Sequence, residues 1–161
     1  MSVERVREYL KNYDLADQIQ EFPVSSATVE LAAQAAGVIP ARIAKSLAFL
    51  LPDGPILVVT AGDAKVDNPK IKARFHAKAK MLSFEEVREL IGHDVGGVCP
   101  FAVADGVRSY LDVSMKRFAT VFPACGSANS AIELTPGQLA SAAQNCQGWV
   151  DVCKAWDEGL R

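Results

Sequence analysis

The segment SLAFLLPDGPILVVTAG, residues 46–62, decides the fold class of this 161-residue chain. Two apolar runs, residues 46–51 and 55–61, flank Asp53-Gly54, a dipeptide that favours the tight turn of a β-hairpin. Neither run approaches the roughly 20 apolar residues that a membrane-spanning helix needs. The segment therefore predicts two antiparallel strands joined by a short turn.

Helices and further strands are predicted on both sides of this hairpin. Apolar residues at helical spacing, capping residues such as Thr28 and Ser83, and stop signals such as Gly37 indicate the helices. Because helices and strands are interspersed without a regular βαβ repeat, the class is α+β with a mixed, largely antiparallel sheet. The predicted helices cover residues 3–12, 29–36, 40–45, 68–75, 84–91, 136–143 and, as a last turn or two, 149–156; the other strands cover residues 19–24, 80–82, 109–113, 119–122 and 132–134.

The length and charge of the chain limit its class. Half of the 161 residues are apolar, so we expect residues 1–161 to form a single domain with one core. The formal net charge of −2 gives no general attraction to phosphate, so a long DNA-binding groove is not expected. The N-terminus lacks the uninterrupted apolar run of a signal peptide. We therefore expect a cytoplasmic protein that binds neither DNA nor a membrane.

The cysteines do not indicate a metal site or a disulfide framework. The chain has four cysteines without a CxxC pair, and neither of its two histidines is close in sequence to a cysteine. Cys146 and Cys153 lie seven residues apart in the predicted C-terminal helix, which is typical of small buried apolar side chains. We expect no metal ion and no other cofactor.

Lys45 stands between Ala44 and Ser46, where the predicted short helix runs into the first apolar strand. A lysine with so few polar neighbours in the sequence is a candidate for a partly desolvated side chain. Such a side chain can anchor a carbonyl or a phosphate, or act as a base. The alternative is a lysine whose ammonium reaches water from the end of a strand. The residues alone leave both interpretations open.

The sequence GGVCPF, residues 96–101, predicts a loop that acts through its backbone. Gly96 and Gly97 allow a close approach to a ligand, and Pro100 holds Cys99 extended. Such a loop can offer N–H groups to a carbonyl or phosphate oxygen, as an oxyanion hole does, and an ordinary loop before a strand is the alternative. No base is identified for Cys99, so we do not expect a thiol nucleophile.

Residues 65–80 form a basic segment in an acidic chain. A solvated helix face is the usual explanation for such a run, and a surface that faces phosphate groups is the alternative. The basic residues of the segment are Lys65, Lys70, Lys72, Arg74, Lys78 and Lys80, against the single acid Asp67.

Gly126-Ser127 begins a small polar turn, and its composition predicts an ordinary hairpin loop.

The order of these motifs resembles the YbaK/EbsC family, the free-standing relatives of the bacterial prolyl-tRNA synthetase editing domain. The resemblance covers about residues 24–139 and implies a compact, barrel-like mixed sheet surrounded by helices, with helical extensions at both ends. Its motifs are SATVELAA (26–33), GVIPARIAKSL (37–47), VVTAGD (58–63), GGVCPF (96–101), and Gly126-Ser127 before IELTP (132–136).

The resemblance implies trans-editing, the metal-independent hydrolysis of the ester that joins a wrong amino acid to the 3′ end of a tRNA. The expected partner is a tRNA acceptor end carrying an aminoacyl group, such as Cys or Ala on tRNA(Pro), with an aminoacyl-tRNA synthetase as a candidate second partner. Lys45 matches the family's functional lysine and is the expected catalytic residue. The expected substrate-binding residues are Thr28, Val29, Ser46, Ala61, Gly96, Gly97, Val98, Cys99, Pro100, Gly126 and Ser127, and the candidates for tRNA contact are Lys70, Lys72, Arg74 and Lys78.

Two positions depart from the common family pattern. Cys99 stands where serine is common, which fits a small side chain in a loop that acts through its backbone. Ala131 stands where many relatives carry an acid, and we transfer no acidic role to Glu133.

Two other functions remain open. A non-catalytic module that binds a tRNA acceptor end or a synthetase would show salt-dependent binding without turnover. A small-molecule thiol or ester hydrolase would act on free esters without tRNA.

Overall fold

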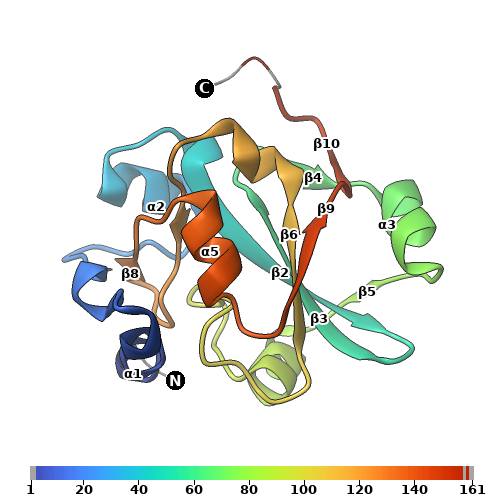
Figure 1. The fold of residues 1–161 in the computed structure, drawn as a ribbon, viewed down its shortest axis with the longest axis horizontal. Coiled ribbons are helices and arrows are strands. Elements are labelled where there is room, and N and C mark those ends of the chain that lie inside the picture. The colour runs from blue at the N-terminus through green and yellow to red at the C-terminus, as the bar shows by residue number, and fades with distance from the viewer. Residues whose placement is uncertain (1–2, 158, 160–161) are drawn as a thin grey trace.

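The computed structural model describes residues 3–157 and 159, and the predicted hairpin lies at its centre. Strand β2 (Ile43–Leu51) pairs antiparallel with β3 (Gly54–Ala61), from Leu51 opposite Gly54 to Ala44 opposite Ala61. Residues 56–61 of β3 are all buried, so this strand is the interior strand of the sheet. Figure 1 shows the hairpin crossing the middle of the molecule. The hairpin prediction is confirmed.

The hairpin belongs to a six-stranded mixed sheet with the order β5-β2-β3-β6-β9, and β7 pairs with β2 off this path. β5 is antiparallel to β2, whereas β6 is parallel to β3, β9 to β6, and β7 to β2. Among the described strands the two ends of the path do not pair, so the sheet is open and not a closed barrel. The α+β class is confirmed. The added strands are β5 (Lys80–Met81), β6 (Arg108–Asp112), β7 (Phe122–Pro123) and β9 (Cys146–Val150).

Two small antiparallel pairs complete the strands. β1 (Gln20–Glu21) pairs with β8 (Ser130–Ala131), and β4 (Lys65–Val66) pairs with β10 (Cys153–Lys154). The strands predicted at residues 119–122 and 132–134 are shifted to Phe122–Pro123 and Ser130–Ala131. Val121 and Leu134, which lie in the predicted ranges, form only an isolated bridge.

The prediction of a helix over residues 149–156 is wrong. Trp149 lies in β9 and Cys153 in β10, so the helical extension expected at the C-terminus is absent from the described residues. The Asp112 carboxylate accepts the Val152 N–H (2.9 Å) and holds the connection between the two strands. Pairing with β6, far away in the sequence, thus outweighs the local spacing of the cysteines.

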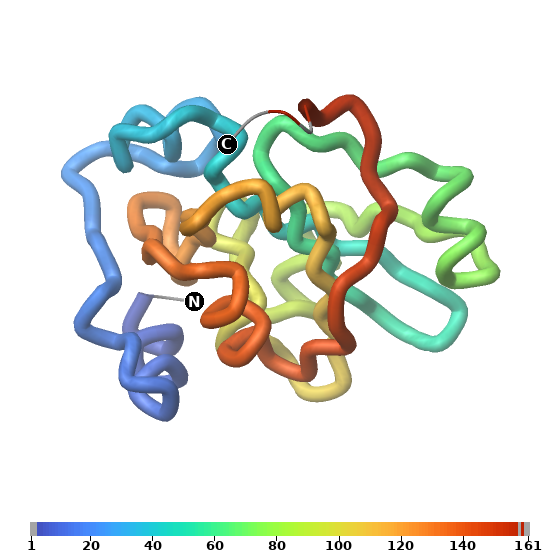
Figure 2. The backbone as a smooth tube through the Cα atoms, turned by 45° about the horizontal axis from the view of Figure 1, so that its top comes forward, coloured from blue at the N-terminus to red at the C-terminus, as the bar shows by residue number. Residues whose placement is uncertain are grey.

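Five of the seven predicted helices form around this sheet. α1 and α2 lie at one end of the molecule, α3 lies at the other end, and α5 lies against the sheet (Figures 1 and 2). The Thr28 side chain caps α2, and capping boxes begin α4 and α5. The helices are α1 (Val3–Leu10), α2 (Val29–Ala36), α3 (Asn68–Phe75), α4 (Phe84–Glu86) and α5 (Pro136–Ala142), with helical turns at Lys11–Tyr13, Ala16–Gln18, Pro40–Arg42, Val87–Ile91 and Val113–Arg117.

The helix predicted over residues 40–45 is wrong in its second half. A single 3₁₀ turn covers Pro40–Arg42, and β2 already begins at Ile43. The reason is pairing on both edges: Ala44 lies opposite Ala61 of β3 and opposite Pro123 of β7. Lys45 is therefore a strand residue and does not lie at a helix end.

Candidate active site

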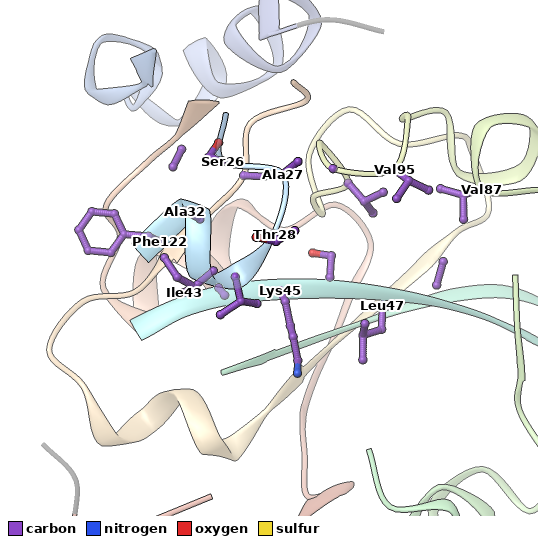
Figure 3. A pocket seen from close by; sticks show the side chains of 18 of the residues that line it. Ser26, Ala27, Thr28, Ala32, Ile43, Lys45, Leu47, Val87, Val95 and Phe122 are labelled. Carbon is purple, nitrogen blue, oxygen red and sulfur yellow. The ribbon is translucent and has the colours of Figure 1, made fainter. Parts of the chain in front are cut away.

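A pocket of about 280 Å³ lies beside β2, and its walls come from β2, the start of α2 and the loop around residues 95–98 (Figure 3). This volume is just below the roughly 300–1,000 Å³ of most small-molecule sites, so the pocket suits a small group. Small side chains such as Ala27, Ala44 and Ala48 make room in it. Among the described residues that line it, Lys45 is the only charged one.

The pocket lies where one edge of β2 is uncovered. On that edge β7 pairs with residues 43–44 and β5 with residues 49–50, and no described strand pairs with the stretch between them. The Ala48 carbonyl accepts the Leu82 N–H on this edge (3.1 Å). Because the backbone groups of alternate strand residues point to the same edge, Ser46 directs its N–H and C=O to the uncovered stretch. No described strand pairs with Ser46 on this edge, and neither group bonds to a described loop or helix.

Lys45 borders the pocket, but its ammonium is bound to a neighbouring loop. Nζ donates to the Ala64 carbonyl (2.6 Å) and to the Gly62 carbonyl (3.5 Å). In Figure 3 the side chain leaves β2 on the side opposite to Thr28. Partial burial lowers the pKa of Lys45, although nearby acidic groups such as Asp63 oppose this. The partly desolvated lysine expected from the sequence is present, and its two carbonyl partners hold it in place.

The loop that holds Lys45 is itself fixed. Arg117 donates to both Asp63 oxygens (2.6 and 2.9 Å), and the Arg117 side chain is almost fully buried. A Cβ on Gly62 would lie 2.1 Å from the Pro40 carbonyl oxygen, so only glycine allows this approach of the two segments. The carbonyls that receive the ammonium therefore have a defined position.

The GGVCPF loop packs directly on the Gly126-Ser127 turn. The Gly126 N–H donates to the Gly97 carbonyl (3.1 Å), and a Cβ on Gly97 would lie 2.6 Å from the Gly126 carbonyl carbon. Gly96 has a φ of +101°, which disfavours other residues. Two motifs separated by almost 30 residues thus form one backbone-to-backbone contact, which places Val98 and Gly96 at the pocket wall.

The backbone of this loop has free donors. Among the described residues, the N–H groups of Val98 and Cys99 have no hydrogen-bond acceptor. Unpaired N–H groups beside a pocket are the arrangement that an oxyanion hole requires. Of the two residues, Val98 lines the pocket and Cys99 is fully buried, so the Val98 N–H is the donor for a carbonyl oxygen of a bound ligand.

The Cys99 side chain is fully buried and does not line the pocket. Its sulfur lies 3.6 Å from His93 Nε2, a contact that the sequence did not suggest. The same nitrogen lies 2.7 Å from the Phe101 carbonyl, so the proton is assigned to Nε2, which donates to this oxygen and cannot accept the thiol proton. Burial also raises the pKa of the Cys99 thiol to about 12. This environment suits a structural thiol and not a nucleophile.

The expected site residues divide into two groups. Those that line the pocket are Thr28, Val29, Lys45, Ser46, Gly96 and Val98, whereas Ala61, Gly97, Cys99, Pro100, Gly126 and Ser127 do not line it. Sequence reasoning missed Ser26 and Ala124, as well as three largely exposed apolar residues at the pocket, Met81, Phe84 and Val95. No local signal indicates the last three, because their role depends on which loop lies beside β2.

The basic segment has its own surroundings at the end of the molecule that carries α3. Lys70 donates to Asp151 (3.0 Å) and to the Cys153 carbonyl (2.8 Å), and the Arg74 guanidinium lies over the Phe75 and Tyr110 rings. Lys72 and Lys78 line a second pocket of about 440 Å³. β5 connects this segment to the first pocket, since Met81 lines the latter.

The position of the missing acid lies in the pocket wall. Ala131 lines the pocket and is buried, so no carboxylate replaces the family's acid there. Glu133 does not line the pocket; it accepts from Thr120 (2.6 Å) and pairs with Arg42 (3.3 Å).

The described residues include no helix with the length and apolar character to cross a membrane. Within residues 3–157 and 159, no three His, Cys, Asp or Glu side chains are grouped as metal ligands would be.

Comparisons with known proteins identify the family of the chain. Residues 24–142 match the family model of the aminoacyl-tRNA editing domain. The chain is 53% identical over 158 residues to the uncharacterized protein YwhH of Bacillus subtilis, and this match covers 98% of the chain and all of YwhH. It is 32% identical over 101 residues to the proline–tRNA ligase of Geobacillus sp., covering 62% of this chain but only 18% of the ligase.

Solved structures share the whole fold. A candidate trans-editing enzyme for prolyl tRNA synthetase superposes with a TM-score of 0.86 at 29% identity, covering 96% of this chain and 99% of that one. The hypothetical protein APE2540 superposes with a TM-score of 0.83 at 27% identity, covering 93% and 99% of the two chains. The family model spans the pocket, the GGVCPF loop and the Lys45 strand, and the chain therefore belongs to the aminoacyl-tRNA editing domain family.

Proposed function

We propose that the whole chain acts as one trans-editing deacylase, which hydrolyses the ester of a mischarged tRNA in the cytoplasm. The observation that carries the proposal is the small pocket beside β2, which joins a partly desolvated lysine to a loop with free N–H donors. Its volume fits an amino acid side chain and part of a ribose, and its lining residues all lie within residues 24–142, which match the editing-domain family. Cys or Ala on tRNA(Pro), or another small amino acid, is the proposed substrate.

The proposed mechanism uses orientation and electrostatic stabilisation. An aminoacyl ester is already activated, so holding its carbonyl and a water molecule in place accounts for much of the acceleration. The Val98 N–H at the pocket wall binds the carbonyl oxygen as negative charge develops on it. No carboxylate lines the described pocket, so we assign activation of the water to the neighbouring ribose hydroxyl of the tRNA.

Lys45 anchors the terminal phosphate or an ester oxygen in this proposal. Its ammonium would exchange the carbonyls of Gly62 and Ala64 for a substrate oxygen, and this exchange costs the hydrogen bonds that the two carbonyls now accept. The lowered pKa follows from burial, and a charged oxygen in contact with Nζ would favour the protonated form again.

The protein has an exposed apolar surface at the pocket that suits the acceptor end of a tRNA. Phe84 is 75% exposed and Met81 58% exposed, and both line the pocket. Exposed aromatic side chains recognise single-stranded ends by stacking on bases. We propose that Phe84 stacks on the terminal base and that Lys72 and Lys78 contact phosphates farther along the acceptor stem. An aminoacyl-tRNA synthetase remains a candidate second partner.

The test is a panel of mischarged tRNAs, with ester loss followed over time for the wild type and for Lys45→Ala. We expect faster ester loss than in buffer for at least one substrate, and a loss of activity of about 100-fold or more in Lys45→Ala, as for removal of one stabilising donor. Lys11→Ala is the matched control, because Lys11 pairs only with Glu8 on the surface. If no substrate is hydrolysed, the deacylase assignment fails. Salt-dependent tRNA binding without turnover would then identify a non-catalytic module.

A further inference from the structure

Two hydroxyl groups in the pocket wall have no partner. Ser26 Oγ and Ser46 Oγ are both buried, and neither makes a hydrogen bond within the described residues. Ser26 as a whole is only 6% exposed. A buried hydroxyl without a partner is unfavourable, and in native structures it calls for an explanation such as an absent ligand.

The other hydroxyl groups in the pocket wall have hydrogen-bond partners. The hydroxyl of Ser130 also lines the pocket, but it is paired with Ser127 Oγ (2.7 Å). The Thr28 hydroxyl accepts the Leu31 N–H as the cap of α2. Most other wall residues are apolar, and among the described residues of the wall Ser26 and Ser46 carry the buried hydroxyls without a partner.

We propose that Ser26 and Ser46 bind the side-chain hydroxyl of the substrate, so that the pocket selects serine or threonine on the tRNA over alanine and cysteine. The inference rests on the proposed function and narrows its substrate, among the small amino acids, to the two that carry a hydroxyl, in place of Cys and Ala. A substrate hydroxyl has one donor and two acceptor sites, and so does each serine, so one group can satisfy both. A methyl group in the same place would leave both serines unpaired.

The α-ammonium of the substrate is the competing partner for these hydroxyls. The uncovered edge of β2 supplies another acceptor for it, because the Ser46 carbonyl points to this edge and has no partner among the described residues. The backbone can therefore take the group that all aminoacyl esters share. This leaves the hydroxyls to the group that differs between serine and alanine.

The experiment compares serine, threonine, alanine and cysteine esters of one tRNA, using kcat/KM for deacylation by the wild type, Ser26→Ala and Ser46→Ala. For the wild type we expect the serine or the threonine ester to exceed the alanine and cysteine esters by about tenfold or more, because sites built to pair a hydroxyl reject analogues that lack it. Each variant should lose about tenfold on that preferred ester and much less on the alanine ester, so the ratio of the two kcat/KM values falls. Ser109→Ala is the matched control, because Ser109 Oγ is also buried and unpaired but does not line the pocket.

Equal rates of the wild type on the serine and alanine esters would overturn the inference. So would equal losses on both esters in the variants, because the hydroxyls would then bind a shared group such as the α-ammonium. Folding is not expected to obscure the result, since removing an unpaired buried hydroxyl should leave the melting temperature unchanged or higher.

Failure of the inference can be separated from failure of the proposed function. Calorimetric titration with seryl and alanyl amides of 3′-amino-3′-deoxyadenosine measures the pocket's preference without hydrolysis. If no ester is cleaved but the seryl amide binds about tenfold tighter in the wild type and not in Ser46→Ala, the deacylase proposal fails and the selectivity stands. If both amides bind equally, the selectivity is wrong whatever the activity.

Discussion

Replacing Gly97 by alanine tests whether the contact between the GGVCPF loop and the Gly126-Ser127 turn holds the pocket wall in place. A Cβ at this position would lie 2.6 Å from the Gly126 carbonyl carbon and 2.7 Å from the Ser127 nitrogen, whereas ordinary contacts begin at 3.4 Å. The two backbones must therefore separate by about 0.8 Å, the difference between 3.4 and 2.6 Å. Backbone atoms, unlike a flexible side chain, cannot turn away from the added methyl group.

The expected loss of stability has two parts. Overpacking of this kind costs about 1–3 kcal/mol, and weakening the hydrogen bond from Gly126 N–H to Gly97 C=O adds about 1 kcal/mol. The sum of about 2–4 kcal/mol corresponds to a decrease in melting temperature of roughly 5–15 °C for a chain of this size. Urea unfolding should show a lower midpoint with an unchanged m value. Deacylation should fall further than the folded fraction explains, because Val98 moves with the loop.

Gly137→Ala is the matched control for this prediction. Gly137 lies in the first turn of α5, and the nearest atom to an added Cβ is 3.8 Å away. Neither glycine has a positive φ, so backbone strain at the substituted residue does not separate the two substitutions. We expect Gly137→Ala to stabilise the protein by about 0.5–1 kcal/mol. A Gly97→Ala protein within about 0.5 kcal/mol of the wild type would refute the packing argument.

Three further predictions concern single side chains. The thiol of Cys99 should not react with a disulfide reagent in the native protein, since burial raises its pKa to about 12, and Cys99→Ser should keep its activity; complete loss with intact folding would restore the thiol nucleophile. Burial lowers the pKa of His93, so the unfolded chain binds the extra proton and stability should be full above about pH 6.5 and fall below it. Urea unfolding at pH 7.5 and 5.0 should show a smaller fall for His93→Gln, and equal falls would contradict the assignment. Phe84→Ala should weaken tRNA binding by about 1–3 kcal/mol while Phe84→Tyr retains it. Val24→Ala, at another exposed apolar residue, should have no effect on binding, and an equal loss there would contradict base stacking.

Local signals predicted the elements whose causes are local. Asp53-Gly54 fixes the hairpin, and Thr28 and Ser83 cap their helices with their own side chains, so these boundaries could be read from a few neighbouring residues. The spacing of Cys146 and Cys153 led to the wrong prediction of a C-terminal helix. Both residues lie in strands that pair with β6 and β4, and no neighbouring residue indicates this pairing.

The site was predicted in part for the same reason. The resemblance identified Lys45 and the GGVCPF loop, and both border the pocket or support it. It could not indicate the direction of the Lys45 ammonium, which depends on the Ala64 carbonyl, 19 residues away. Nor could it indicate that Ser26 and Ser46, 20 residues apart in the chain, line one pocket without partners.

The uncovered edge of β2 has a consequence for amide hydrogen exchange. Most amides of a central strand exchange slowly, because opening them requires extensive unfolding. The Ser46 N–H faces the pocket without a partner in the described structure, so it should exchange rapidly between slowly exchanging neighbours. A group that fills the pocket and accepts this N–H would slow its exchange. The Ser46 amide is thus a built-in spectroscopic reporter of pocket occupancy, readable for any ligand whether or not it is hydrolysed.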